Sequence, residues 1–230
     1  IKFFEIGKIY TAKGEKSVIG ALMVGALSDD WRQIEKKHVD YYDLKGAIEQ
    51  IFERRGIKRE NVQFNLSNEG GFSQGQSALI SINGNPSGII GKIDDKVLTS
   101  WGIKLKDVFF AQIDFDSLCR GKNGPAKYKQ ISEFPVISRD ISLAVKLDVT
   151  AQDVERAIYE TTKPENHLFL SDLKFVELYE GDKIPKGHRG LIFSLTYQSR
   201  LPKTLRDEEV EQVHRKVCSA LVNGLGVIQR

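Results

Sequence analysis

The first half of the chain alternates between strand-like and helix-like hydrophobic periods. Alternating or short apolar runs indicate strands at residues 1–10, 18–27, 62–66, 76–82, 88–93 and 107–115. Between the second and third of these, Leu44, Ile48 and Phe52 recur at helical spacing and predict a helix over residues 41–55. Asp40 precedes this stretch as a helix-capping residue. We therefore expect an α+β module with a largely antiparallel sheet.

The second half contains six segments in a clear order. A strand at residues 139–147 is followed by a helix that Thr150 caps, and then by a long hairpin at residues 171–198. A second helix, capped by Thr204, and a short strand at residues 226–230 complete the chain. This β-α-β-β-α-β order is that of a ferredoxin-like domain. Its two helices should cover one face of the sheet and leave the other face open for binding.

One stretch between the halves has the composition of a linker. Residues 119–127 are rich in Gly, Pro, Asn and Lys and offer almost nothing to bury. We therefore expect one module at residues 1–118 and a second domain at residues 128–230. Because the chain begins inside strand-like sequence at Ile1, we also expect it to be a fragment of a longer protein.

The long hairpin carries the most suggestive surface chemistry. Strand alternation predicts Phe175, Glu177 and Tyr179 on one face and Val176 and Leu178 on the other. A tyrosine can stack on a base while a neighbouring carboxylate accepts hydrogen bonds from the base edge. The same residues also fit an amphipathic hairpin whose tip is simply solvated.

The return strand of this hairpin separates Leu191, Phe193 and Leu195 from Gly190. It partly resembles a strand of the RNA recognition motif. However, Leu191 and Thr196 stand where stacking aromatics are needed, and Phe193 falls on the expected core face. We therefore exclude that family.

Charge narrows the location of any nucleic-acid contact. The formal net charge is only +3 over 230 residues, so a binding surface must be a local patch. One run of sequence has cations and no acidic residue, and its members are Lys183, Lys186, Arg189, Arg200, Lys203 and Arg206. We expect Lys186, Arg189, Arg200 and Lys203 to contact phosphates, although a solvated loop could have the same composition.

The sequence provides no catalytic or metal centre. Phosphate-loop, dinucleotide-binding, zinc-peptidase and serine-hydrolase motifs are all absent. Cys119 and Cys218 lie far apart without a CxxC pair, which favours a reducing compartment and argues against a disulfide framework or zinc site. The longest apolar run, residues 18–27, is too short to span a bilayer.

We assign Arg139 and Asp140 to a structural role, as an ion pair at the start of a strand.

Three ordered stretches form a recognisable set: residues 128–141 (YKQISEFPVISRDI), 177–188 (ELYEGDKIPKGH) and 204–210 (TLRDEEV). Together they resemble the family of bacterial phenylalanine–tRNA ligase β subunits. Residues 4–10 (FEIGKIY) and 42–46 (YDLKG) extend the resemblance more weakly into the first half. One departure is the SQGQS at residues 73–77, where the family usually has His-Pro-Gly-x-Ser.

The resemblance implies a fold and a role for each half. Residues 1–118 would be a class II synthetase catalytic-like module without a working active site, serving as a subunit interface. Residues 128–230 would be a ferredoxin-fold anticodon-binding domain. The whole enzyme would be a cytoplasmic α2β2 ligase that joins phenylalanine to tRNA(Phe) with ATP and Mg2+, with catalysis in the α subunit. We therefore expect no catalytic residue, metal or cofactor on this fragment, and no membrane or DNA partner.

The family's anticodon contacts fall on the long hairpin. Its stacking tyrosine corresponds to Tyr179, and its acidic neighbour corresponds to Glu177. A serine of its return strand corresponds to Gly190, so that hydroxyl contact is either lost here or supplied by another residue.

Two functions of other classes stay open. A ferredoxin-like fold also suits a regulatory or protein-interaction module with no RNA role. The basic loop, however, suits RNA binding better than it suits an effector pocket, which needs an apolar lining. Alternatively, the fragment serves only as a scaffold for subunit docking.

Overall fold

The computed structural model describes residues 1–12, 14–28, 37–120, 133–163, 168–181 and 184–230. The chain divides into two compact units, Ile1–Lys127 and Tyr128–Arg230, and each is described by itself. Most of the linker expected at residues 119–127 lies outside the described residues, while Cys119 is the last residue of a short helix. None of the helices in the described part of the chain has the length and apolar run needed to cross a membrane.

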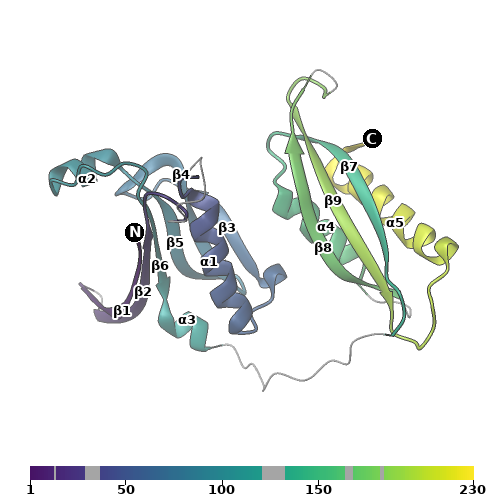
Figure 1. The fold of residues 1–230 in the computed structure, drawn as a ribbon, viewed down its shortest axis with the longest axis horizontal. Helices are drawn as coiled ribbons and strands as arrows, with labels where there is room; N and C mark the ends of the chain where they lie inside the picture. Colours follow the sequence, from purple (N-terminus) through teal and green to yellow (C-terminus); the bar gives the residue numbers. More distant parts are fainter. Residues whose placement is uncertain (13, 29–36, 121–132, 164–167, 182–183) are drawn as a thin grey trace. The chain divides into compact units, whose positions relative to one another are not determined.

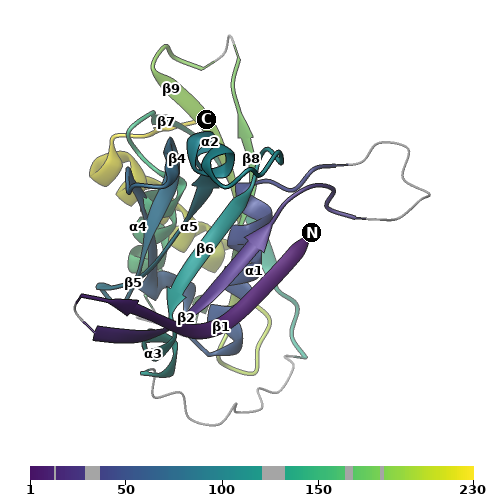
Figure 2. The same cartoon turned by 90° about the vertical axis from the view of Figure 1, so that its left-hand side faces the viewer.

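In its described residues, the first unit is an antiparallel six-stranded sheet with three short to medium helices (Figures 1 and 2). Its elements are β1 (Lys2–Thr11), β2 (Gly14–Met23), α1 (Tyr41–Arg54), β3 (Val62–Ser67), β4 (Phe72–Ile82), β5 (Asn85–Ile93), α2 (Asp95–Ser100), β6 (Phe109–Asp114) and α3 (Phe115–Cys119), with a 3-10 turn at Arg59–Asn61. The strand order is β1-β2-β6-β5-β4-β3, which makes β1 an edge strand. The predicted α+β module with an antiparallel sheet is confirmed.

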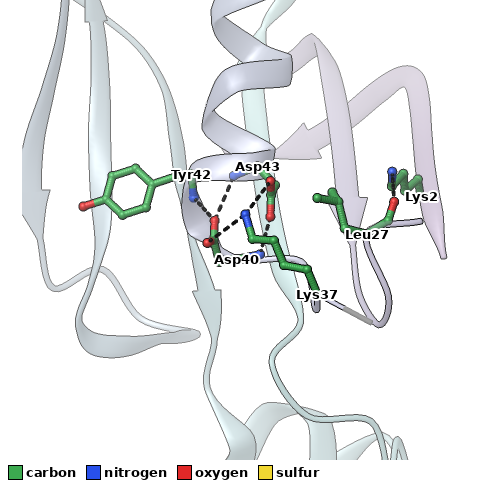
Figure 3. Close-up of polar contacts among 6 residues, drawn as sticks. All are labelled: Lys2, Leu27, Lys37, Asp40, Tyr42 and Asp43. Atoms are coloured by element: carbon green, nitrogen blue, oxygen red, sulfur yellow. Dashed lines mark hydrogen bonds and ion pairs between the residues drawn. The ribbon is translucent and has the colours of Figure 1, made fainter. Parts of the chain in front are cut away.

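Helix α1 begins where the sequence predicts. The side chain of Asp40 accepts hydrogen bonds from the backbone N–H groups of Tyr42 and Asp43, and the Asp43 carboxylate accepts from the Asp40 N–H at 2.8 Å (Figure 3). The Nζ atom of Lys37 lies 3.6 Å from that Asp43 carboxylate. This capping box satisfies N–H groups that have no partner inside the helix.

The inner stripe of α1 packs on the sheet. The residues that form this core from both elements are Leu44, Ile48, Phe52, Ile80, Ile90 and Ile113. All six are buried. Burying one such side chain contributes about 1.5–3 kcal/mol, so the stripe explains why the helix lies against the sheet.

The described part of the second unit is a four-stranded antiparallel sheet with two helices. Its elements are β7 (Ile137–Lys146), α4 (Ala151–Thr161), β8 (Leu168–Tyr179), β9 (His188–Ser199), α5 (Asp207–Leu225) and β10 (Ile228–Gln229). The strand order is β10-β7-β9-β8, with β9 inserted between β7 and β8 and antiparallel to both. This split βαβ arrangement confirms the predicted ferredoxin-like fold.

Helices α4 and α5 lie on the same side of this sheet (Figure 1). Val154 and Ile158 of α4 and Val217 of α5 share one core with Leu191 and Phe193 of β9. The opposite face of β7, β8 and β9 carries no helix in the described part of the unit, and we call it the open face.

The start of α5 differs from the prediction. The helix begins at Asp207, with Arg206 and not Thr204 as its cap, and the Glu209 carboxylate accepts a hydrogen bond from the Arg206 N–H at 3.1 Å. Leu205 is buried between these two positions. The chain therefore stays extended until Leu205 has reached the core, which delays the helix.

The predicted ion pair of Arg139 with Asp140 is wrong. Successive strand residues point to opposite faces, so the two side chains of β7 diverge. The Arg139 guanidinium instead pairs with the Asp207 carboxylate in the first turn of α5. That pair joins β7 to α5, and because Asp207 is largely exposed we expect it to contribute at most about 1 kcal/mol.

A buried polar pair lies between β9 and α5. The Tyr197 hydroxyl is 3.2 Å from Nδ1 of His214, and both side chains are buried. Burial lowers the pKa of His214, because the charged imidazolium would lose its water; nearby Glu211 opposes this shift and Arg139 adds to it. Burial also raises the pKa of Tyr197, so its hydroxyl stays protonated at physiological pH.

We predict that acid destabilises the second unit through His214. Because the folded-state pKa is depressed, the unfolded chain takes up the proton first as pH falls. Stability should therefore be full above the ordinary histidine pKa of about 6.5 and decrease below it. Hydrogen-exchange protection of β9 and α5 amides, measured between pH 7.5 and 5.5, tests this. His214→Gln should flatten the dependence and His188→Gln should not; equal slopes in wild type and His214→Gln would contradict the assignment.

Candidate nucleic-acid interface

Strand β8 changes the face of its side chains twice. Its pairing with β9 shifts register between Leu170 and Asp172 and again between Phe175 and Glu177. Each shift inserts one extra residue, Ser171 and then Val176, and an extra residue reverses the alternation that follows it. A face assignment by simple alternation therefore fails along this strand.

The prediction that Phe175 shares a face with Glu177 and Tyr179 is wrong for this reason. Phe175 pairs with Phe193 on the helix-covered face, and their ring centroids are 5.4 Å apart. Glu177 pairs with Ile192 and Tyr179 with Gly190, which places both side chains on the open face. Glu177 and Tyr179 therefore remain together, as predicted.

Register across the sheet arranges the open face in rows. The rows are Tyr179–Gly190–Ala144, Glu177–Ile192–Ser142, Lys174–Ser194–Asp140 and Asp172–Thr196–Ser138, each written from β8 to β7. Most of these side chains are small or polar, and the charged ones are of both signs. The face is therefore a polar surface without a net excess of cations.

Tyr179 lies across this surface rather than standing away from it. A Cβ atom added to Gly190 would come within 2.3 Å of Cζ, 2.4 Å of Cε1 and 2.6 Å of Cε2 of the tyrosine ring. The hydroxyl of Tyr179 is 3.0 Å from Oγ of Ser142, on the far side of β9. The side chain thus spans from β8 over β9 to β7.

Glu177 occupies the row next to Tyr179. Its side chain is exposed, and its cross-strand partner Ile192 is half-buried. An ionised carboxylate only accepts hydrogen bonds. The pair therefore combines an aromatic face with an acceptor on one side of the sheet.

The four predicted phosphate contacts do not form one patch. Lys186 is exposed in the hairpin tip next to Tyr179, whereas Arg200 and Lys203 follow the other end of β9. Because β9 has 12 residues, those two ends are about 36 Å apart. The unbroken basic run in the sequence therefore becomes two separate groups of cations.

Three of these cations have other contacts. The Arg189 guanidinium donates to the Val149 carbonyl at 2.8 Å. Arg200 lies over the ring of Phe169, with 5.3 Å to the centroid, and Nζ of Lys203 is 2.8 Å from the Glu209 carboxylate.

Sequence reasoning missed Ser142. Alternation along the strand at residues 139–147 could have placed it on the open face, but nothing local indicates that it meets Tyr179. That contact depends on the register of β7 with β9 and of β9 with β8. It also depends on the bulge at Val176.

Comparisons with known proteins cover both units. A family model described as the phenylalanyl tRNA synthetase beta chain CLM domain matches residues 1–115. A second, described as the ferredoxin-fold anticodon binding domain, matches residues 132–230.

Curated relatives carry the same family name. The chain is 31% identical over 230 residues to a protein of Clostridium tetani named phenylalanine–tRNA ligase beta subunit, covering 98% of this chain and 27% of that protein. Proteins with this name from Geobacillus kaustophilus and Halalkalibacterium halodurans are 29% and 32% identical, with 100% and 99% of this chain covered and 28% of each relative. The chain thus spans little more than a quarter of the length of these relatives. With one family model matching half of the chain and a second matching most of the rest, the chain belongs to the family of phenylalanine–tRNA ligase β subunits.

Proposed function

We propose that this chain is the C-terminal, non-catalytic part of a phenylalanine–tRNA ligase β subunit. Residues 128–230 would bind tRNA(Phe) through its anticodon, and residues 1–118 would support a catalytic α subunit in a cytoplasmic α2β2 enzyme. The names of the relatives and the anticodon-binding family model support this role. The observation that carries it is the ring of Tyr179, which lies flat on an open polar sheet face beside the carboxylate of Glu177.

Tyr179 and Glu177 supply complementary parts of base recognition. Stacking of a base on an aromatic ring is worth about 1–3 kcal/mol and tolerates any base, because every base has a π-face. A carboxylate selects among bases, because it accepts hydrogen bonds only from an edge that presents N–H donors. Tyr179 would therefore provide affinity, and Glu177 would provide discrimination.

Lys186 is the cation that we propose first as a phosphate contact. It is exposed at the hairpin tip, beyond the pair His188–Lys146 that follows the row of Tyr179. Arg200 and Lys203 would act on RNA that extends to the other end of β9. Arg189 would have to release the Val149 carbonyl before it could bind a phosphate.

The first unit has a surface that suits subunit docking. Its edge strand β1 exposes Phe3, Phe4 and Ile6, and Phe4 is 69% exposed. Phe4 and Ile6 lie on one face of β1 and Phe3 on the other. Large apolar side chains exposed along an edge strand typically mark a protein interface. This supports the proposed role of residues 1–118 as an interface module.

ATP and Mg2+ would bind to other parts of the enzyme. Within the described ranges of this chain, no three His, Cys, Asp or Glu side chains gather into a set that could hold a metal ion. We propose that both cofactors belong to the α subunit, where they would drive attachment of phenylalanine to the tRNA.

We predict that Tyr179→Ala, in the full β subunit assembled with α subunits, raises the KM for tRNA roughly 5- to 150-fold. This range corresponds to the ~1–3 kcal/mol of one stacked base. Phenylalanine-dependent ATP–pyrophosphate exchange should be unchanged, since that step needs no anticodon. Val222→Ala, an exposed change on α5, is the control and should have no effect. Unchanged tRNA kinetics in Tyr179→Ala would refute the proposal.

Glu177→Gln tests base discrimination. The amide keeps the size of the side chain but loses the charge and replaces one acceptor by a donor. We expect binding of the cognate anticodon stem–loop to weaken more than binding of stem–loops with substituted anticodon bases. An equal loss for every stem–loop would argue against readout of a base edge.

Lys186→Ala tests the phosphate contact. Removing one such contact should reduce the slope of log affinity against log salt by ~0.7–0.9, as measured by titration with the anticodon stem–loop at several salt concentrations. Lys216→Ala, which removes an exposed cation from α5, should leave the slope unchanged. If the wild-type chain fails to bind the stem–loop even at low salt, the interaction-module alternative gains support.

A further inference from the structure

The contact between Tyr179 and Gly190 is face-on. The Cβ position at Gly190 is nearly equidistant from Cζ, Cε1 and Cε2, at 2.3, 2.4 and 2.6 Å. A point beside the ring edge, outside Cζ, would be clearly farther from the two Cε atoms than from Cζ. The position therefore lies above the plane of the ring, and the aromatic face rests on the backbone of Gly190.

Only glycine permits this pose. Carbon atoms in contact are normally about 3.5–4.0 Å apart, so a methyl group at position 190 would have to push the ring up by roughly 1 Å or turn it aside. Gly190 lies in the middle of paired strand, between Ala144 and Tyr179, and its backbone is not in the left-handed region. Its requirement is therefore for space above the sheet and not for backbone freedom.

Ser142 fixes the far end of the same side chain. Its hydroxyl and that of Tyr179 are 3.0 Å apart. Ala144, the neighbour of Gly190 on β7, is fully buried and small, so no large side chain at that position competes with the ring for space. A tyrosine held at both ends has already lost its rotamer freedom, so a base that binds it does not need to restrict it again.

We propose that Gly190 and Ser142 are positioning residues that hold Tyr179 flat on the open face, so that only its outer ring face is offered to a base. This inference rests on the proposed anticodon-binding function and deepens it. Because the inner ring face is covered by Gly190, the ring stacks with one base and cannot insert between two. The arrangement links a residue of β9 and one of β7 to recognition by β8.

A double-mutant cycle tests Gly190. In the assembled enzyme, Gly190→Ala should weaken binding of the anticodon stem–loop about fivefold or more, the lower end of the effect of losing one stacked base. In the Tyr179→Ala background the same change should cost less than about twofold, because the ring that it displaces is gone. Gly181→Ala is the matched control on the same hairpin, since its Cβ would meet nothing within 4 Å, and it should bind as wild type does.

A second cycle tests Ser142. Ser142→Ala and Tyr179→Phe each remove one partner of the hydroxyl contact and should each weaken binding about two- to tenfold, the range of a single hydrogen bond. The double variant should be no weaker than either single one. Ser142→Thr, which keeps the hydroxyl, should retain more affinity than Ser142→Ala.

The outcomes separate this inference from the proposed function. If Tyr179→Ala leaves tRNA binding unchanged, the proposed function fails. If Tyr179→Ala weakens binding but Gly190→Ala binds as Gly181→Ala does, the positioning role is refuted. It is also refuted if Gly190→Ala loses as much affinity in the Tyr179→Ala background as in the wild type. The thermal midpoint of each variant is measured in parallel. If the loss of binding is proportional to the drop in thermal midpoint and also occurs in the Tyr179→Ala background, the positioning role is likewise refuted.

Discussion

The pairing of β9 with β7 and β8 is the constraint on which the second unit depends. One side of β9 presents Leu191, Phe193 and Leu195 to α4 and α5, and all three are fully buried or nearly so. The other side presents Gly190 and Ile192 to the open face. Each large buried side chain contributes about 1.5–3 kcal/mol. A one-residue slip of the register would turn all three side chains away from the helices, so their burial energies would be lost together. The register that secures the core therefore also fixes the surface under Tyr179.

The edge strand β8 meets this constraint through two bulges. Leu173 and Phe175 follow the first bulge and face the helices, while Glu177 and Tyr179 follow the second and face away from them. Without the extra residue at Val176, Tyr179 would turn towards the helix-covered side and Leu178 towards the open face. Bulges also make an exposed edge less suitable for pairing with another chain. The same local irregularity thus protects the edge and directs the tyrosine.

Charge has a limited part in this surface. The open face holds acidic and basic side chains together, and the cations of the basic run lie in two groups at opposite ends of β9. Sequence-independent binding to nucleic acid depends mainly on many phosphate contacts, and such binding weakens steeply with salt. The rows of the open face hold one tyrosine, three carboxylates (Glu177, Asp140 and Asp172) and Lys174. This composition fits the proposed selection of a base better than it fits sequence-independent binding of a phosphate backbone.

Elements whose signals are local could be predicted from the sequence. The stripe of α1 with its Asp40 cap, the cap of α4 at Thr150 and the alternation along β9 all follow from neighbours within a few residues, and the structure has them as predicted. Three features could not be predicted: the faces of the β8 side chains, the start of α5 and the partner of Arg139. They depend on long-range packing and on hydrogen-bonded register. The same holds for the pose of Tyr179, which needs Gly190 from one strand and Ser142 from another. The residue type at the candidate site was therefore readable from the sequence, whereas the surface that holds it was not.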